Sequence, residues 1–419
     1  MTLRIPFTLL SFLWLAILFC PDVLAQPKKK TPKVVFIIVD GIPADAIEKL
    51  NPPTLAAIAK TGGFTRAYVG GVTDAYNQTP TISAPGYIDL LSGVWANKHN
   101  VWDNDIAAPN YHYWNIFRIA ETVNPALKTA VFSTWLDNRT KLIGEGLPAA
   151  GAIKLDYAFD GLETDTVKYP HDKTRDFIRN IDDAVTAEAA TYIAKQGPDL
   201  SWVYLEYTDD MGHGFGDSPQ FEDAIKGADA RIKKIWEATQ LRERKFDEDW
   251  LIIITTDHGR DAATGKNHGG QSDRERTTWI VTNAKILNGH FKPQPAIVDI
   301  LPSICNHLHL DIPVEVKKEL DGVPFIGPVS ISDLHAERKD DQIVLSWKNL
   351  GISTAIVDVL VTDTNHYKEG GSDTYVSMGT TTIGQESFTF TPKSQSPIYK
   401  ILLKTFNQYT NTWVVTKQP

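Results

Sequence analysis

The chain has 419 residues, more than one ordinary domain needs, and this length favours two domains. Hydrophobic residues at 42% and charged residues at 22% are typical of a globular protein with a sizeable core. A formal net charge of −9, without a basic stripe along the chain, argues against a nucleic-acid-binding surface.

Residues 1–25 have the pattern of an export signal. Arg4 supplies the positive end, the apolar run FTLLSFLWLAILF follows it, and Ala25 offers a small residue for cleavage. The run is too short for a comfortable membrane span, and no later segment competes with it. We therefore expect an exported protein, periplasmic or secreted, with no membrane span. Cleavage would remove Cys20 and leave Cys305 alone, so no internal disulfide could form.

Three apolar runs farther along the chain each end at an aspartate. VVFIIV leads to Asp40, WVYLEY leads to Asp209, and WLIIITT leads to Asp257. Their β-branched and aromatic residues predict buried strands. Helical stretches alternate with them, for example over 182–194, where a Gly-Pro pair follows the helix. This alternation predicts an α/β domain over residues 26–326, with a mainly parallel sheet flanked by helices.

The stretch TPTISAPGYIDLLSG, residues 79–93, predicts a helix start between the first two of these strands. Pro85 suits the first helical position, and Ser83 or Ala84 lies near the N-cap. A hydroxyl group there lies at the positive end of a helix dipole, beside unpaired N–H groups that suit a phosphate oxygen. Taken alone, Ser83 could simply cap the helix. Beside metal ions, its oxygen would become a nucleophile at neutral pH.

Histidines accompany two of the three aspartates. His213 follows Asp209 by four residues near a glycine-rich turn, His258 directly follows Asp257, and His268 lies ten residues later. Any one of them could be an ordinary loop residue. Together they fall at the carboxyl ends of parallel strands, where open α/β sheets bind ligands. Three aspartates and three histidines are about what two divalent transition metals need, so the sequence predicts a metalloenzyme.

After residue 326 the pattern changes to short alternating strands separated by turn residues. This pattern predicts a small β-sandwich over residues 327–419, with Trp347 as its core aromatic residue. The segment resembles a fibronectin type III module by pattern. We expect it to have a passive or docking role.

Residues 33–326 resemble the alkaline phosphatase superfamily, most closely its nucleotide pyrophosphatase/phosphodiesterase branch. The family's motifs Val-Asp-Gly, Pro-Thr-Lys-Thr-Phe-Pro, Pro-Asp-x-x-Gly-His, Asp-His-Gly and His-Gly occur in the same order here. They are similar to Val39-Asp40-Gly41, to PTISAP at 80–85, to TDDMGH at 208–213, to Asp257-His258-Gly259 and to His268-Gly269.

The resemblance implies two metal sites, with zinc as the expected metal. One site would use Asp209, His213 and His268, and the other would use Asp40, Asp257, His258 and the Ser83 oxygen. It also implies that Ser83 attacks phosphorus, that a covalent phospho-serine forms, and that water hydrolyses it. A family histidine without a metal role matches His99, which we therefore expect to be structural.

Several positions that would choose the substrate depart from the family. Gly86 replaces an asparagine that binds a phosphate oxygen, so backbone N–H groups, the metals or another side chain such as Asn104 would have to bind it. Ser83 replaces the usual threonine of the branch, which leaves Thr81 as an alternative nucleophile. Arg139 is present without the lysine that accompanies it in phosphomonoesterases, where the pair clamps a terminal phosphate.

The sequence thus favours an exported two-metal hydrolase of phosphodiester or nucleotide pyrophosphate bonds that acts on a small phosphorylated substrate. A phosphomonoesterase on the same scaffold is the alternative enzyme. A surface binding protein with a degenerate metal site is the alternative outside enzymes.

Overall fold

The structure is a computed structural model that describes residue 2 and residues 30–415. The predicted export signal at 1–25 lies, apart from residue 2, outside the described residues. No helix in the described part of the chain combines the length and the apolar character that a membrane span requires.

A seven-stranded sheet forms the centre of the larger part of the molecule, in the order β2-β7-β6-β1-β5-β3-β4. Strands β1 and β3 to β6 run parallel to their neighbours in this set, whereas β7 is antiparallel to both β6 and β2. The predicted mainly parallel sheet is confirmed. The strands are β1 (Thr31–Val39), β2 (Gly63–Tyr68), β3 (Thr129–Ser133), β4 (Tyr157–Phe159), β5 (Leu200–Leu205), β6 (Glu248–Thr255) and β7 (Thr277–Thr282).

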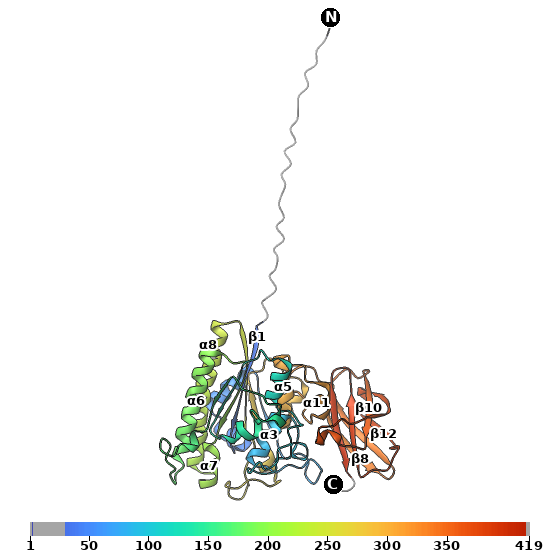
Figure 1. Ribbon diagram of the computed structural model, residues 1–419, viewed down its shortest axis with the longest axis horizontal. Coiled ribbons are helices and arrows are strands. Elements are labelled where there is room, and N and C mark those ends of the chain that lie inside the picture. The colour runs from blue at the N-terminus through green and yellow to red at the C-terminus, as the bar shows by residue number, and fades with distance from the viewer. Residues whose placement is uncertain (1, 3–29, 416–419) are drawn as a thin grey trace.

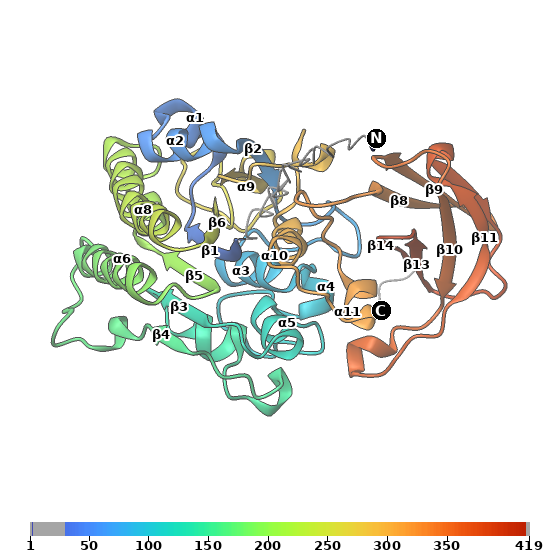
Figure 2. The ribbon, with the colours of Figure 1, turned by 90° about the horizontal axis from the view of Figure 1, so that it is seen from above.

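Helices cover both faces of this sheet, as Figures 1 and 2 show. Both faces of strand β1 are apolar and must be covered. Val34, Phe36 and Ile38 belong to one buried cluster, and the intervening residues belong to another. One face packs against α3 (Ser83–Ser92), α5 (Ile116–Val123), α10 (Ile300–Leu308) and α11 (Val314–Glu319). The other packs against α1 (Ala44–Leu50), α2 (Pro53–Thr61), α6 (Asp176–Gln196) and α8 (Pro219–Lys245).

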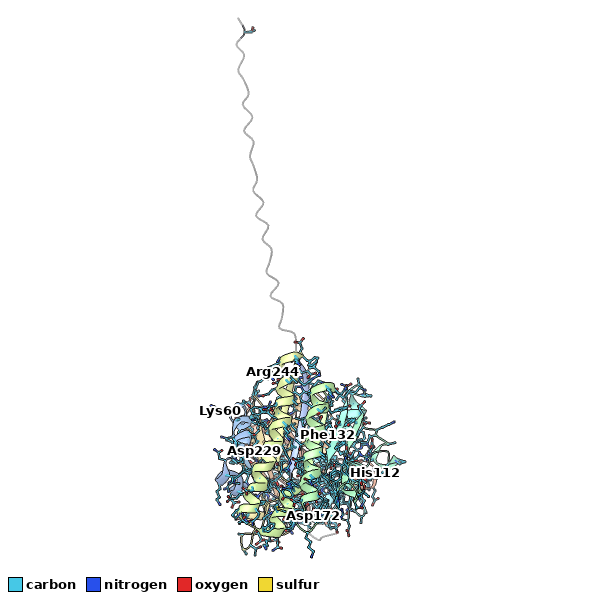
Figure 3. The ribbon with its side chains drawn as sticks, turned by 90° about the vertical axis from the view of Figure 1, so that its left-hand side faces the viewer. Lys60, His112, Phe132, Asp172, Asp229 and Arg244 are labelled. Carbon is cyan, nitrogen blue, oxygen red and sulfur yellow. The ribbon has the colours of Figure 1, made fainter. Side chains whose placement is uncertain are left out.

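Figure 3 views the molecule from the side that α6 and α8 cover. Asp229 of α8 is labelled there, and its carboxylate accepts hydrogen bonds from the N–H groups of Thr54 (3.0 Å) and Leu55 (2.9 Å). A negative charge at the start of α2 satisfies N–H groups that have no partner within the helix. The outer helix α8 thereby fixes α2 against the sheet.

Helix α6 begins at Asp176, so the predicted start near residue 182 is wrong. Asp182 is buried inside the helix and accepts hydrogen bonds from the N–H groups of Glu206 (3.1 Å) and Tyr207 (3.1 Å). Its carboxylate therefore anchors the chain just after β5 and does not cap its own helix. The predicted end is confirmed, because Gly197 takes the left-handed conformation with φ +57°.

Two antiparallel sheets make up the C-terminal part, in the orders β11-β10-β13-β14 and β12-β9-β8. They pack around a buried cluster that includes Trp347, which confirms the predicted β-sandwich and its core aromatic residue. Figure 2 shows these strands on one side of the helix-covered sheet. Strands β11 and β14 were not among the predicted strands. The fibronectin type III likeness and the boundary at 326 stay predictions. The strands are β8 (Ile331–Lys339), β9 (Gln342–Asn349), β10 (Ile356–Thr362), β11 (Val376–Thr382), β12 (Ser387–Phe390), β13 (Ile398–Lys404) and β14 (Tyr409–Val415).

Candidate active site

The three strands that carry the predicted aspartates are neighbours at the centre of the sheet, in the order β6-β1-β5. Asp40 directly follows β1, and Asp257 lies two residues after the last residue of β6. Asp209 lies in the first turn of α7 (Tyr207–Phe215), which begins just after β5. Parallel strands end at the same edge, so the three carboxylates converge there.

The segment around Asp209 and His213 is helical, and the predicted glycine-rich turn is wrong. Both residues belong to α7, where a spacing of four residues puts them one above the other on the same face. The His213 Nε2 atom lies 3.2 Å from Asp209 Oδ2. The helix therefore aligns these two groups more rigidly than a turn would.

The first cluster consists of Asp40, Asp257 and His258, and the Ser83 hydroxyl joins it. From His258 Nε2, the distances are 3.4 Å to Asp40 Oδ1, 3.3 Å to Asp257 Oδ2 and 3.3 Å to Ser83 Oγ. Ligands about 2.0–2.1 Å from a tetrahedral zinc ion lie about 3.3–3.4 Å from one another. The three distances from His258 Nε2 thus match the spacing of ligands on one metal.

The second cluster consists of Asp209, His213 and His268. The Nε2 atoms of the two histidines lie 3.1 Å apart. The His268 ring also stacks on the His258 ring of the first cluster, with ring centroids 3.7 Å apart. The two clusters are therefore adjacent, as a substrate that touches both would require.

Thr81 holds the second cluster in place. Its carbonyl oxygen lies 2.9 Å from His268 Nδ1, so Nδ1–H can donate to it and Nε2 then faces the cluster. The Thr81 hydroxyl donates to the Gly270 carbonyl (2.8 Å) and accepts from the Gly269 N–H (2.9 Å). These bonds occupy the hydroxyl and disfavour Thr81 as the nucleophile.

The described residues fit a divalent metal at the first cluster. Asp40 Oδ1 and Asp257 Oδ2 are buried and accept no hydrogen bond from the described protein. Burial and the charges of Asp257 and Asp209 raise the pKa of Asp40 well above its ordinary value. Burial and the Asp209 charge raise the pKa of Asp257 to about 7. A nearby cation would offset the free-energy cost of ionising these two buried carboxyl groups and keep them as carboxylates.

Asp209 behaves differently from the other two carboxylates. Burial opposes its ionisation, but the hydrogen bond from His213 and the charge of Arg260 outweigh burial, so the pKa of Asp209 lies below its ordinary value. The same bond raises the pKa of His213. Burial lowers the pKa of His258 and that of His268, which favours the neutral imidazole that binds a metal.

Two tyrosines that the sequence analysis did not assign orient Asp40. The Tyr204 hydroxyl donates to Asp40 Oδ2 (2.7 Å), and the Tyr87 hydroxyl contacts the same oxygen and lies 2.7 Å from the Tyr204 hydroxyl. Both tyrosines lie on segments with other assigned roles, the Ser83 helix and the WVYLEY strand. In the sequence, the only sign of this role was a tyrosine hydroxyl within an otherwise mainly apolar run.

Helix α3 begins at Ser83, so Pro85 is its third residue and not its first. Ser83 is therefore at the positive end of the helix, and its side chain is mostly buried. Gly86 packs directly on the strand-end loop, because a Cβ there would lie 2.8 Å from the Asp257 carbonyl oxygen. The family's asparagine would not fit at this position in this chain.

His99 and Arg139, both named from the sequence, lie outside the two clusters. His99 is buried, lies 2.8 Å from Asp89 Oδ1 through Nε2, and accepts from the Val101 N–H through Nδ1. This is the structural position expected for it. Arg139 is bound in ion pairs with Asp160 (2.6 Å) and Glu145 (2.7 Å).

A pocket of about 240 Å³ opens beside the first cluster. Asn104 lines it, and its Oδ1 atom accepts the N–H of Ala84 at 3.0 Å, which leaves its amide N–H groups to donate elsewhere. Among the described residues that line this pocket, no lysine or arginine occurs. The lining residues are Asp40, Ser83, Tyr87, Asn104, Trp135, Tyr204, Glu206 and Asp209.

Fold and site together define the class of this protein, which is a phosphoric ester hydrolase with an alkaline phosphatase-like fold. The family model described as type I phosphodiesterase/nucleotide pyrophosphatase matches residues 34–309. The chain belongs to this family. No curated protein matches the chain in sequence.

Two solved structures with TM-scores of 0.50 and 0.51 show the same fold at low sequence identity. A putative sulfatase from Bacteroides thetaiotaomicron matches with a TM-score of 0.51 and 11% identity, covering 83% of this chain and 86% of that one. The phosphonate monoester hydrolase of Agrobacterium radiobacter matches with a TM-score of 0.50 and 12% identity, covering 92% and 89%. Murine ectonucleotide pyrophosphatase/phosphodiesterase 5 has 15% identity and a TM-score of 0.45, covering 67% and 96%.

Proposed function

We propose that the chain is an exported hydrolase of phosphodiesters that uses two divalent metal ions and a covalent phospho-Ser83 intermediate. The observation that carries this proposal is the position of the Ser83 hydroxyl, 3.3 Å from His258 Nε2 and within the donor set of Asp40 and Asp257. A serine whose only role was to cap its helix would not need to lie beside these metal-ligand candidates. The expected signal at 1–25 supports export, to the periplasm or the medium.

The donor set fits zinc, with Asp40, Asp257, His258 and Ser83 at one site and Asp209, His213 and His268 at the other. When bound, the metals would supply Lewis-acid chemistry, lowering the pKa of a hydroxyl and stabilising developing negative charge.

The protein groups carry the remaining steps. The Ser83 oxygen forms a bond to phosphorus as the bond to the leaving alcohol oxygen breaks. Water then breaks the bond between Ser83 and phosphorus and restores the hydroxyl. The amide of Asn104 lies in the pocket, where it can donate to a non-bridging oxygen in place of the asparagine that Gly86 replaces.

The charges around the pocket support diesters over monoesters. A terminal phosphate carries a second negative charge, and its usual clamp is a pair of cationic side chains. Arg139, the candidate from sequence, is neutralised by Asp160 and Glu145. No lysine or arginine among the described residues that line the pocket supplies such a clamp. A singly charged diester suits this lining better than a dianionic monoester.

Hydrolysis of bis(4-nitrophenyl) phosphate and of 4-nitrophenyl phosphate by the zinc-loaded protein tests the proposal. We expect the diester to be the better substrate, by kcat/KM. Ser83→Ala should lower kcat on the diester by at least about 10³-fold, because the other hydroxyls that line the pocket, those of Tyr87 and Tyr204, are bound to Asp40.

Ser92→Ala is the matched control, since Ser92 lies on the same helix and its hydroxyl only donates to the Ile88 carbonyl. It should retain the wild-type rate. A preference for the monoester would contradict the proposed substrate, and wild-type activity in Ser83→Ala would contradict the proposed nucleophile.

A further inference from the structure

One buried guanidinium connects the segments that supply the aspartates and histidines of the two clusters. Arg260 is fully buried, two residues after His258. Its Nε donates to the Gly41 carbonyl (2.9 Å), next to Asp40, and its Nη1 donates to the Lys266 carbonyl (3.1 Å), two residues before His268. Its Nη2 donates to the carbonyl of Asp209 (2.8 Å) and contacts Asp209 Oδ1.

Two glycines leave the space that the Arg260 side chain occupies. A Cβ added to Gly212 would overlap the Arg260 guanidinium, and a Cβ added to Gly41 would overlap both Arg260 and the Asp209 carboxylate. Gly212 lies within helix α7, where glycine destabilises the helix relative to alanine. Both glycines belong to the ligand-bearing motifs, so these motifs also form the walls around Arg260.

The contact divides the two oxygens of Asp209 between two tasks. Oδ1 is bound by Arg260, whereas Oδ2 lies 3.2 Å from His213 Nε2, on the side of the second cluster. The guanidinium is planar and rigid, so its bonds to the Gly41 and Lys266 carbonyls fix the direction in which Nη2 meets the Asp209 carboxylate. Oδ1, which also lies 4.0 Å from His268 Nε2, is thereby held, and Oδ2 is left to act as a ligand beside His213.

We propose that Arg260 is a positioning residue that holds one oxygen of Asp209 and aligns the segments that carry the aspartates and histidines of both clusters. The inference rests on the proposed two-metal function and deepens it. A buried arginine with a purely structural role would need a carboxylate partner, but it would not need bonds beside Asp40, at Asp209 and just before His268 as well. Partners behind metal ligands typically change metal affinity by about 10–100-fold when they are removed.

Zinc titration of the metal-free protein, with a competing chromophoric chelator, tests this role without relying on activity. Arg260→Met should lower the zinc affinity of the second site by about 10–100-fold while the far-ultraviolet circular dichroism stays native. Arg260→Lys keeps the charge but loses the fork, so it should restore only part of the affinity. Gly212→Ala keeps the arginine but displaces it, and it should weaken zinc binding in the same direction.

Arg242→Met is the matched control. Arg242 is another buried arginine paired with a carboxylate, Glu248 at the start of β6, roughly 25 Å along the strand from the site. It should leave zinc affinity unchanged although it lowers stability. Wild-type zinc affinity in both Arg260→Met and Gly212→Ala would overturn the inference and leave the proposed function standing. Failure of the wild-type protein to bind zinc would overturn both.

Discussion

Each of the three carboxylates at the site has one oxygen held by the protein and one oxygen turned to the other side chains of its cluster. The free oxygens are Oδ1 of Asp40 and Oδ2 of Asp257, with Oδ2 of Asp209 beside His213. The held oxygens are bound by Tyr87 and Tyr204 for Asp40, by the Gly41 N–H (3.1 Å) for Asp257 and by Arg260 for Asp209. This division orients each carboxylate before a metal binds.

Asn104 is the residue that we expect to replace the missing phosphate-binding asparagine. Asn104→Ala should lower kcat on a diester by about 10²-fold, because removal of one donor to a developing negative charge has that effect. The effect should fall on kcat more than on KM, and steady-state kinetics with bis(4-nitrophenyl) phosphate would measure both.

The neighbouring Asp103 provides a control in the same loop, since it is exposed and its carboxylate only accepts the Asp105 N–H. Asp103→Ala should keep the wild-type constants. If Asn104→Ala left kcat unchanged, backbone N–H groups or metals would bind the non-bridging phosphate oxygen instead.

At the scale of elements, the sequence predicted the strands and their aspartates because apolar runs that stop at a charged residue leave few alternatives. The same reasoning failed for the segment with Gly212 and Gly214, since two glycines locally favour a turn over the helix that forms. The helix is accounted for by a distant residue, Arg260, that fills the space beside Gly212. The bonds of Tyr87 and Tyr204 to Asp40 are equally long-range and leave no local pattern.

Buried ion pairs join the C-terminal β-sandwich to the α/β part. Lys98 of α4 (Ala96–His99) donates to the Glu319 carbonyl (2.7 Å), to Asp321 (2.5 Å) and to Asn411 of β14 (2.9 Å). Lys400 of β13 pairs with the Glu319 carboxylate at the end of α11 and with Asp373. Since α4 follows the Ser83 helix, the sandwich supports the segment after the nucleophile.

Lys400→Met tests this junction. The change removes a fully buried cation and leaves two carboxylates without their partner, so the free energy of unfolding should fall by about 3–5 kcal/mol. Denaturation by urea, followed by tryptophan fluorescence, would measure it.

Lys404→Met on the same strand serves as the comparison, because Lys404 is half exposed and its nearest carboxylate, Asp358, lies 3.9 Å away. It should change the free energy of unfolding by no more than about 0.5 kcal/mol. Equal effects of the two substitutions would mean that the buried pairs do not stabilise the junction.

At the scale of the whole molecule, the fold class could be predicted because it follows from the alternation of apolar strands and helices. The convergence of the aspartates and histidines could be predicted because topology brings the ends of β1, β5 and β6 to one edge. The substrate could not be predicted from the sequence. The pocket is formed by side chains such as Asn104, Trp135 and Glu206, which come from separate segments. Their meeting depends on tertiary packing, which no local pattern records.

The most direct test of the central claim is acid quenching of the zinc-loaded enzyme during its first turnover of bis(4-nitrophenyl) phosphate, followed by peptide mass spectrometry. The account predicts a 4-nitrophenyl phosphoryl group on the peptide that contains Ser83, on the Ser83 oxygen, in proportion to the nitrophenol released. Nitrophenol release with an unmodified peptide, or with the adduct on Thr81, would contradict it.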